Sequence, residues 1–236
     1  ADDAVDDQVK ISIARVCARM RVPEATEFLC RYWTISDLNV RMSVLEALSY
    51  RSYSATPENE SVIISALREE AKFVMWCAES IRTLRNNDKT EIVLSALQLE
   101  IDQAIERAYQ WVSFISDPQL IMSAKKQMKR ASKNEWALIL EALDQVIDSD
   151  IQPFVMPLFE RLSVDMLWEK LRDHAPEHAS MTPEAVLMSI IRENDLWIDP
   201  WLRTSAIYIV PDVGASDELT RVLYNVMKAH DGIVSE

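Results

Sequence analysis

The sequence predicts an all-α fold, arranged as an α-solenoid of stacked helix pairs. Three observations predict it: glycine is nearly absent, apolar residues recur at helical spacing, and helix-start signals continue along the chain. Only Gly214 and Gly232 occur in 236 residues, whereas an average usage of about 7% would give roughly sixteen. Because hairpins, β-bulges and phosphate-binding loops need glycine at positive φ, the composition favours helices and excludes Gly-rich nucleotide loops.

Each predicted helix has a recognisable beginning. Val5, Val9, Ile13, Val16 and Met20 are spaced as on one helical face, so we expect an amphipathic helix over the first twenty residues. A polar cap or a first-turn proline marks every later start. These starts are Pro23, Asp37, Pro57, Asp88, Pro118, Ser132, Pro153, Ser163, Pro183, Pro200 and Ser216. They predict about a dozen helices with short connections.

Two of the predicted helices are unusually long. The apolar pattern runs nearly unbroken from Pro57 to about Arg85, and again from about Asp88 to Ser116. Both segments are close to or above the usual upper length of a globular helix. We therefore expect a tall antiparallel helical pair over about 57–116.

A short motif recurs along the chain. An aspartate followed four residues later by an arginine occurs at Asp37–Arg41 and again at Asp199–Arg203. A weaker copy begins at Asp117 but carries Ile121 in place of the arginine. The three aspartates are 80 and 82 residues apart, which corresponds to two periods of about forty residues, the length of a HEAT or armadillo unit.

The motif resembles the second helix of HEAT repeats, in which the aspartate and arginine link neighbouring units. That resemblance implies structural roles for Asp37, Arg41, Asp199 and Arg203. It also implies a single solenoid domain over 1–236, built from about five to six HEAT- or armadillo-like helix pairs with two longer middle helices. Such repeats bury their apolar faces by stacking on one another.

Short stretches at 101–107, 141–144, 153–162 and 197–203 resemble one particular HEAT domain. It occurs in bacterial membrane proteins after an ADP/ATP translocase-like transmembrane part, in some cases before a cyclic-nucleotide-binding domain. The similarity covers roughly 5–212 and implies a cytosolic module tethered to a transporter, with no catalytic residue and no cofactor. A chain that begins with Ala1 and ends at Glu236, directly after a predicted helix, agrees with a segment of a longer protein.

Charge and cysteine content narrow the function classes. The formal net charge is −13, which repels a phosphate backbone and makes nucleic acid an unexpected partner. Cys17, Cys30 and Cys77 form an odd set without CxxC spacing, as expected of reduced, buried thiols in a cytoplasmic protein. The chain contains no run of 18 apolar residues, so we expect a soluble module, cytoplasmic or tethered at the cytoplasmic face of the inner membrane.

A basic run is the sharpest charge feature, and it consists of Lys125, Lys126, Lys129, Arg130 and Lys133. Helical spacing places these cations on one flank. One interpretation is a docking surface for anionic lipid headgroups, an acidic protein partner or a ligand phosphate. The other is a solvated face, paired with carboxylates of neighbouring helices.

Aromatic and histidine residues supply two further candidates. Most of the seven tryptophans fall in apolar helical phase, but Trp197 and Trp201 lie four apart near a helix start and form a candidate aromatic anchor for a partner. His174 and His178 have a metal-compatible spacing, yet Pro176 breaks the helix between them. No metal site is therefore expected.

The acidic residues Glu100, Asp102 and Glu106 lie beside Arg107, and we expect an exposed acidic stripe with local ion pairs. No residue set is marked as catalytic. The sequence therefore favours a non-enzymatic interaction or regulatory scaffold, bound to a protein partner or to neighbouring domains of its own chain. The alternatives are a free-standing cytosolic HEAT-repeat scaffold and, disfavoured by the charge, a HEAT-like DNA glycosylase.

Overall fold

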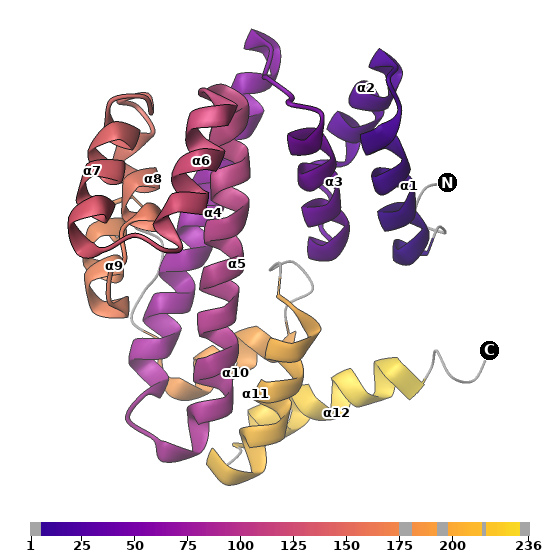
Figure 1. Ribbon diagram of the computed structural model, residues 1–236. Helices are drawn as coiled ribbons and strands as arrows, with labels where there is room; N and C mark the ends of the chain where they lie inside the picture. Colours follow the sequence, from indigo (N-terminus) through magenta and orange to yellow (C-terminus); the bar gives the residue numbers. More distant parts are fainter. Residues whose placement is uncertain (1–5, 175–180, 193–197, 214–215, 232–236) are drawn as a thin grey trace. The chain divides into compact units, whose positions relative to one another are not determined.

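The computed structural model describes residues 6–174, 181–192, 198–213 and 216–231 (Figure 1). Within these ranges the chain forms twelve α-helices and a single 3₁₀ helix, and it contains no strand. The prediction of an all-α fold is therefore confirmed for the described residues. None of the helices in these ranges combines the length and the apolarity needed to cross a bilayer.

The helices follow one another with short connections. They are α1 (Asp7–Arg19), α2 (Pro23–Tyr32), α3 (Leu38–Tyr50), α4 (Pro57–Leu84), η2 (Asp88–Thr90), α5 (Glu91–Ile115), α6 (Pro118–Met128), α7 (Lys133–Asp144), α8 (Gln152–Phe159), α9 (Val164–Leu171), α10 (Pro183–Arg192), α11 (Pro200–Val213) and α12 (Asp217–Asp231). The two long helices expected between 57 and 116 are α4 and α5.

The helix starts predicted from caps and prolines are confirmed. The Asp37 carboxylate accepts the Val40 N–H at 2.8 Å, so it caps α3. Ser132 and Glu135 form a capping box at the start of α7, which satisfies two backbone donors that the helix itself leaves unpaired. Asp88 begins the 3₁₀ turn η2, and α5 follows directly at Glu91. These signals act over a few residues, which is why they are readable from sequence.

The described chain divides into two compact units. Unit 1 comprises 1–72 and 103–162, and unit 2 comprises 73–102 and 163–236. The first part of α4 and the second part of α5 belong to unit 1, and the remaining parts of both helices belong to unit 2.

Aromatic rings fill the core of unit 1 between α2, α5 and the segment after α3. The Trp33 ring lies 5.7 Å from Trp111 and 5.9 Å from Tyr53 in edge-to-face geometry. The Tyr53 ring in turn lies 5.4 Å from Phe114. Pairs of this geometry stabilise a core beyond the area that they bury. Burial raises the pKa of Tyr53 to about 12, although the Asn59 side chain donates to its hydroxyl.

A buried ion pair joins α4 and α5 inside unit 1. Arg107 donates from Nε and Nη2 to the two carboxylate oxygens of Glu70, at 2.8 and 2.9 Å, and both side chains are buried. Arg41 is also buried and donates to the carbonyl oxygens of Thr34 and Ile35. Burial lowers the pKa of Arg41 to about 10, Glu70 opposes that shift and Arg107 adds to it.

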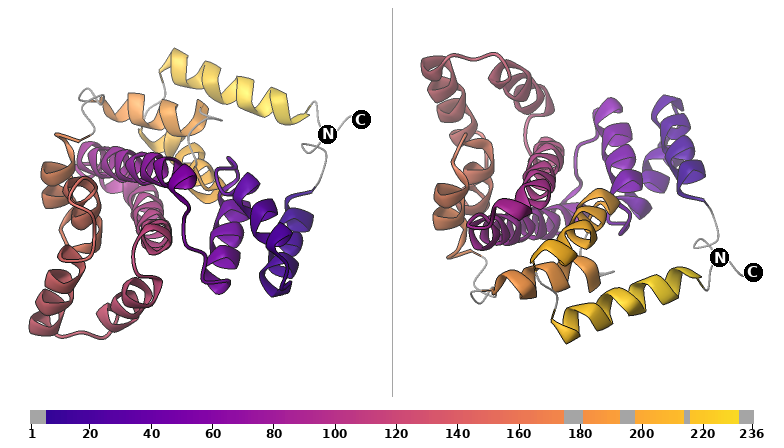
Figure 2. Two further views of the ribbon diagram at one scale, coloured as in Figure 1. Left: turned by 90° about the horizontal axis from the view of Figure 1, so that it is seen from above. Right: turned by 90° about the horizontal axis from the view of Figure 1, so that it is seen from below.

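Arg51, just after α3, ties the first three helices together. Its guanidinium donates to Thr26 Oγ1 at 2.9 Å and to the carbonyl oxygens of Cys17, Met20 and Val22. These acceptors lie at the end of α1, in the α1–α2 connection and on α2. Both views in Figure 2 place α1 beside α3.

In unit 2, the end of α4 is fastened to α9. The Arg82 guanidinium lies 3.9 Å over the Trp168 ring, and its Nε donates to Asp165 at 3.0 Å. Arg85 donates to the second Asp165 oxygen at 2.8 Å, which lowers the pKa of that carboxyl. Helix α10 packs against α11 and α12.

The expectation of an exposed acidic stripe beside Arg107 on α5 is wrong for Glu100 and for Arg107 itself, whereas Asp102 is exposed as expected. Glu100 is buried, and its Oε1 accepts the backbone N–H of Asp199 at 2.7 Å. Arg107 is buried with Glu70, whereas Glu106 reaches toward α6. The expectation failed because α5 has neighbours on several faces, so its charged residues find partners far away in sequence.

Candidate anion-binding surface at the α6–α7 turn

Helices α6 and α7 carry the predicted basic run and are joined by the short turn at 129–132 (Figure 1). Helix α6 begins at Pro118, where the Asp117 carboxylate accepts the N–H groups of Gln119 and Leu120. Lys125 and Lys126 lie in its last turn. Cations at this position complement the partial negative charge of a helix C-terminus.

An open hollow of about 750 Å³ lies between the end of α6 and the first turns of α7. We call it the α6–α7 hollow. It is lined by Ser123, Lys126, Gln127, Lys129, Arg130, Ala131, Glu135, Leu138 and Ile139. Three of the five cations predicted as a docking surface therefore share one concave site. Lys133 begins α7 and is exposed, but it does not line the hollow.

Lys125 does not line the hollow but points toward α5. Its Nζ lies 2.5 Å from Glu106 Oε2 on α5 and 5.6 Å from the centre of the Tyr109 ring. The Lys125 side chain is only 12% exposed, whereas that of Lys129 is 67% exposed. Lys129 lies 3.5 Å from the other Glu106 oxygen. Lys125 thus fastens α6 to α5, and Lys129 is shared between Glu106 and the hollow.

The hollow is positively charged within an acidic chain. Lys126, Lys129 and Arg130 contribute three positive charges, and Glu135 contributes one negative charge. Lys126 and Arg130 are exposed and form no ion pair with the described part of the chain. Glu135 is held by its capping box, because Ser132 donates to its Oε2 from N and Oγ at 2.8 and 2.7 Å. These bonds lower the pKa of Glu135.

An apolar wall completes the hollow. Leu138 on α7 is 66% exposed, and Ile139 lies beside it at intermediate exposure. Cations next to exposed apolar side chains are able to take a partner that presents both carboxylates and apolar groups. A free inorganic anion would leave this wall in contact with water.

Arg161, which follows α8, holds the hollow in shape. Its guanidinium lies 4.0 Å over the Trp136 ring of α7 and donates to the Met128 carbonyl oxygen at the end of α6, at 2.8 Å. The Met128 side chain is also held by α5, since the Tyr109 hydroxyl donates to its sulfur at 3.0 Å. The Tyr109 ring stacks on Phe159 at 3.9 Å. Burial raises the pKa of Tyr109, and the negative charge of the nearby Glu106 raises it further.

The aromatic anchor predicted in the second half is described only in part. Trp201 is half exposed in the first turn of α11, where its N–H donates to the Asp199 carboxylate at 2.7 Å. Trp197 and His178 lie outside the described residues, and His174 lies in the turn after α9. Three or more metal-ligating side chains do not gather anywhere in the described ranges.

Three of the four residues of the repeat motif have local roles. Asp37 and Asp199 act as caps, Arg41 closes the α2–α3 connection, and Arg203 is partly buried on α11. Whether they also link neighbouring repeats stays a prediction.

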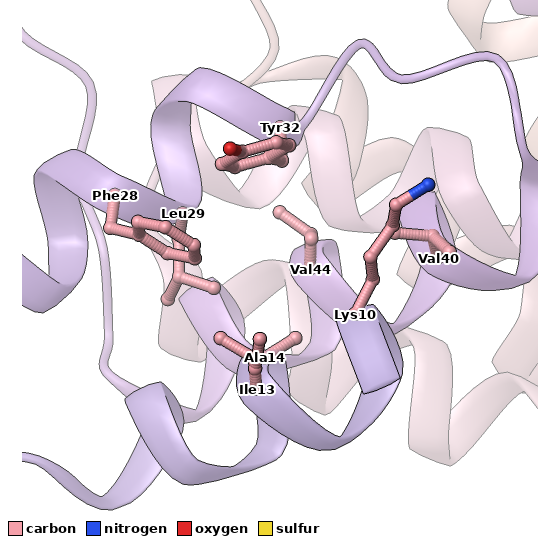
Figure 3. Close-up of a pocket in the computed structure, with 8 residues that line it drawn as sticks. All are labelled: Lys10, Ile13, Ala14, Phe28, Leu29, Tyr32, Val40 and Val44. Carbon is pink, nitrogen blue, oxygen red and sulfur yellow. The ribbon is translucent and has the colours of Figure 1, made fainter. Parts of the chain in front are cut away.

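A second, smaller pocket lies among α1, α2 and α3 (Figure 3). Its volume is about 200 Å³. Its lining is almost entirely apolar and consists of Lys10, Ile13, Ala14, Phe28, Leu29, Tyr32, Val40 and Val44. In Figure 3 the Phe28 and Tyr32 rings form one wall, and the Lys10 side chain extends along another.

Sequence reasoning found the cations of the α6–α7 hollow but missed its other parts. Leu138 belongs to a run of apolar residues on α7, and nothing local distinguishes it from its buried neighbour Leu143. The role of Arg161 could not be predicted from sequence, because the two residues that it contacts lie 25 and 33 positions away. Comparisons with models of protein families, with curated proteins and with solved structures found no match to this chain.

Proposed function

We propose that this protein is a non-enzymatic interaction module whose α6–α7 hollow docks an acidic segment of a protein partner or of a neighbouring domain. The observation that carries the proposal is the group of three cations on one concave site in a chain with a net charge of −13. Like charges over most of the surface disfavour acidic partners elsewhere, so this hollow is where such a partner is attracted.

The lining narrows the kind of partner. Leu138 and Ile139 offer apolar contact beside Lys126 and Arg130. A helix with carboxylates flanking apolar residues would satisfy both kinds of side chain at once. The cations would speed the encounter, and the apolar contacts would prolong the complex.

The proposal includes an α-solenoid of HEAT-like helix pairs as the scaffold. The recurring motif at Asp37 and Asp199 supports it, as do the short connections between helices. We further propose that the module is tethered to a transporter-like membrane protein in the cytoplasm, on the resemblance described above. A full-length gene with hydrophobic spans upstream of residue 1 is the expected finding. A gene without such spans favours the free-standing scaffold instead.

A charge-reversal experiment tests the hollow. The probe is a fluorescein-labelled amphipathic peptide with leucines at i, i+3, i+4 and i+7 and glutamates on both flanks, followed by fluorescence anisotropy at low salt. We expect Lys126→Glu/Arg130→Glu to weaken binding at least about tenfold, since two attractive contacts become repulsive. The control Arg31→Glu/Arg221→Glu makes the same change in net charge at exposed positions on other helices.

The matched control distinguishes a site from a general charge effect. Equal loss of binding in both double variants would contradict the proposal, as would unchanged binding in the Lys126→Glu/Arg130→Glu variant. Vesicles of phosphatidylglycerol form a second arm. Binding to these vesicles that depends on Lys126 and Arg130, without binding of the peptide, would assign the hollow to a lipid surface and overturn the protein partner. Release of an alkylated base from DNA by the wild-type chain would favour the glycosylase alternative.

A further inference from the structure

The outer face of α1 is apolar and exposed to solvent. Val9, Ile13, Val16 and Met20 are 48%, 38%, 58% and 45% exposed, respectively. Val9, Ile13 and Val16 follow one another at helical spacing on α1, and Met20 is the C-cap residue directly after it, where the backbone is extended. The helix packs through other residues, since Ile11, Ala14 and Cys17 are its buried positions. We call the four exposed residues the α1 stripe.

The apolar surface continues beyond α1. The small pocket in Figure 3 shares Ile13 with the α1 stripe, and Phe28, which also lines this pocket, is 37% exposed. Val22, in the α1–α2 connection, is also exposed. An apolar stripe with a pocket beside it is typical of a surface that takes a helix and one inserted side chain.

Charges along α1 are arranged with opposite signs at its two ends. Asp6 and Asp7 stand at the beginning, where Lys10 forms an ion pair with Asp7 at 2.9 Å and leaves Asp6 as the excess charge, whereas Arg15, Arg19 and Arg21 stand toward the end. The three arginines are exposed and form no ion pair with any residue that the structure describes. Glu46 shares a hollow with Arg15 and Arg19, but it lies beyond ion-pair distance.

We propose that the α1 stripe is a self-association surface, on which a second copy of this chain docks its own α1 in antiparallel orientation. A two-fold axis near the middle of the stripe pairs Val9 with the Met20 of the second copy and Ile13 with its Val16. The same operation brings the acidic beginning of each helix to the basic end of the other. An isologous interface requires this kind of self-complementarity.

The local charge disfavours other occupants. Between residues 6 and 32 the chain has five basic and four acidic residues, a difference of only +1. Such a balance gives little net attraction to an anionic membrane, because acidic residues of the same segment offset its arginines. The mixture of acidic and basic residues favours a partner with a similar mixture of charges. A second copy of the chain has the same residues and therefore the same mixture. The pocket beside Ile13 then receives an apolar side chain from the stripe of the second copy.

Sedimentation equilibrium of the full chain tests the proposal over about 5–300 µM, a range suited to the weak affinity of a small interface. We expect wild-type protein to show a monomer–dimer equilibrium. Val16→Glu should weaken dimerisation at least about tenfold, because it places a carboxylate in the apolar centre of the interface. Leu99→Glu is the matched control, since Leu99 on α5 is 45% exposed and should leave the dimer unchanged.

Charge exchange tests the orientation. Asp6→Lys and Arg21→Glu should each weaken the dimer, because each brings like charges together. The double variant Asp6→Lys/Arg21→Glu should restore it, since the antiparallel pairs are formed again with exchanged signs. Far-UV circular dichroism checks that every variant retains its helices.

Three results would overturn the dimer: monomeric wild-type protein over the whole concentration range, equal loss in Val16→Glu and Leu99→Glu, or no recovery in the double variant. Binding of monomeric protein to phosphatidylglycerol vesicles through Val16 would instead assign the stripe to a membrane. The dimer does not depend on the α6–α7 hollow, so Lys126→Glu/Arg130→Glu should dimerise like wild type.

Discussion

At the residue scale, some charged side chains in this protein form ion pairs that stabilise the fold, and others are exposed and available to bind a partner. Arg107 and Glu70 pair in the core, Lys125 and Glu106 join two helices, and Arg130 is exposed without an ion pair among the described residues. Their neighbours in sequence do not predict this division. It depends on whether a partner of opposite charge lies within reach in the folded chain.

The Glu70–Arg107 pair allows a sharp stability prediction. Glu70→Ala should lower the free energy of unfolding by about 3–5 kcal/mol, because it leaves the Arg107 guanidinium buried without its partner. The double variant Glu70→Met/Arg107→Met should lose much less, since the Arg107 guanidinium is removed together with its partner. Urea unfolding followed by circular dichroism measures both. A single variant as stable as the double variant would show that the pair is not buried as described.

At the element scale, the α6–α7 turn is held by contacts from outside the two helices. Arg161 bridges the Met128 carbonyl oxygen and the Trp136 ring, while Lys125 and Met128 fasten α6 to α5. The hollow is therefore formed by its surroundings as much as by its own turn. A change at Arg161 should alter the hollow without touching any cation that lines it.

Arg161→Lys should weaken binding of the acidic peptide roughly three- to tenfold, with little loss of helix content. Lysine keeps the charge, but it lacks the planar guanidinium that stacks on Trp136 while donating to Met128. Backbone amide shifts of residues 128–136, measured by NMR, should move in this variant. Normal peptide affinity together with unmoved shifts would mean that Arg161 does not position the turn.

At the scale of the whole molecule, net charge dominates the electrostatics. Twenty-five basic and 38 acidic residues leave a formal charge of −13, which repels itself in the compact state. Exposed ion pairs such as Lys72–Glu69 offset little of this repulsion. Salt should therefore stabilise the protein.

Thermal unfolding tests this balance. Raising sodium chloride from about 20 to 500 mM should raise Tm by about 2–4 °C, since relief of about 1 kcal/mol shifts Tm by that amount in a chain of this length. Potassium chloride serves as a control for ion-specific effects. A fall in Tm with salt would show that surface ion pairs outweigh the overall repulsion.

The sequence by itself determined the local structure. Caps such as Asp37, Asp117 and Ser132 bond to backbone groups two or three residues away, so their effect is visible without knowledge of the fold. The scarcity of glycine and the prolines at helix starts also affect only the backbone conformation of nearby residues. For the same reason, the long helices could be predicted. The five cations were expected on one helical flank, but only Lys125 and Lys126 lie on α6, whereas Lys129 and Arg130 lie at the turn after it and Lys133 begins α7.

Only the tertiary structure decided which faces are covered. Periodicity found the α1 stripe as an apolar face, yet that face is exposed and α1 packs through Ile11, Ala14 and Cys17. Glu100 became a buried acceptor for a residue 99 positions away. Burial and ion pairing depend on contacts between segments that are distant in sequence. Helical periodicity predicts which residues share a face of a helix, but it does not predict whether that face packs against another helix or is exposed to solvent.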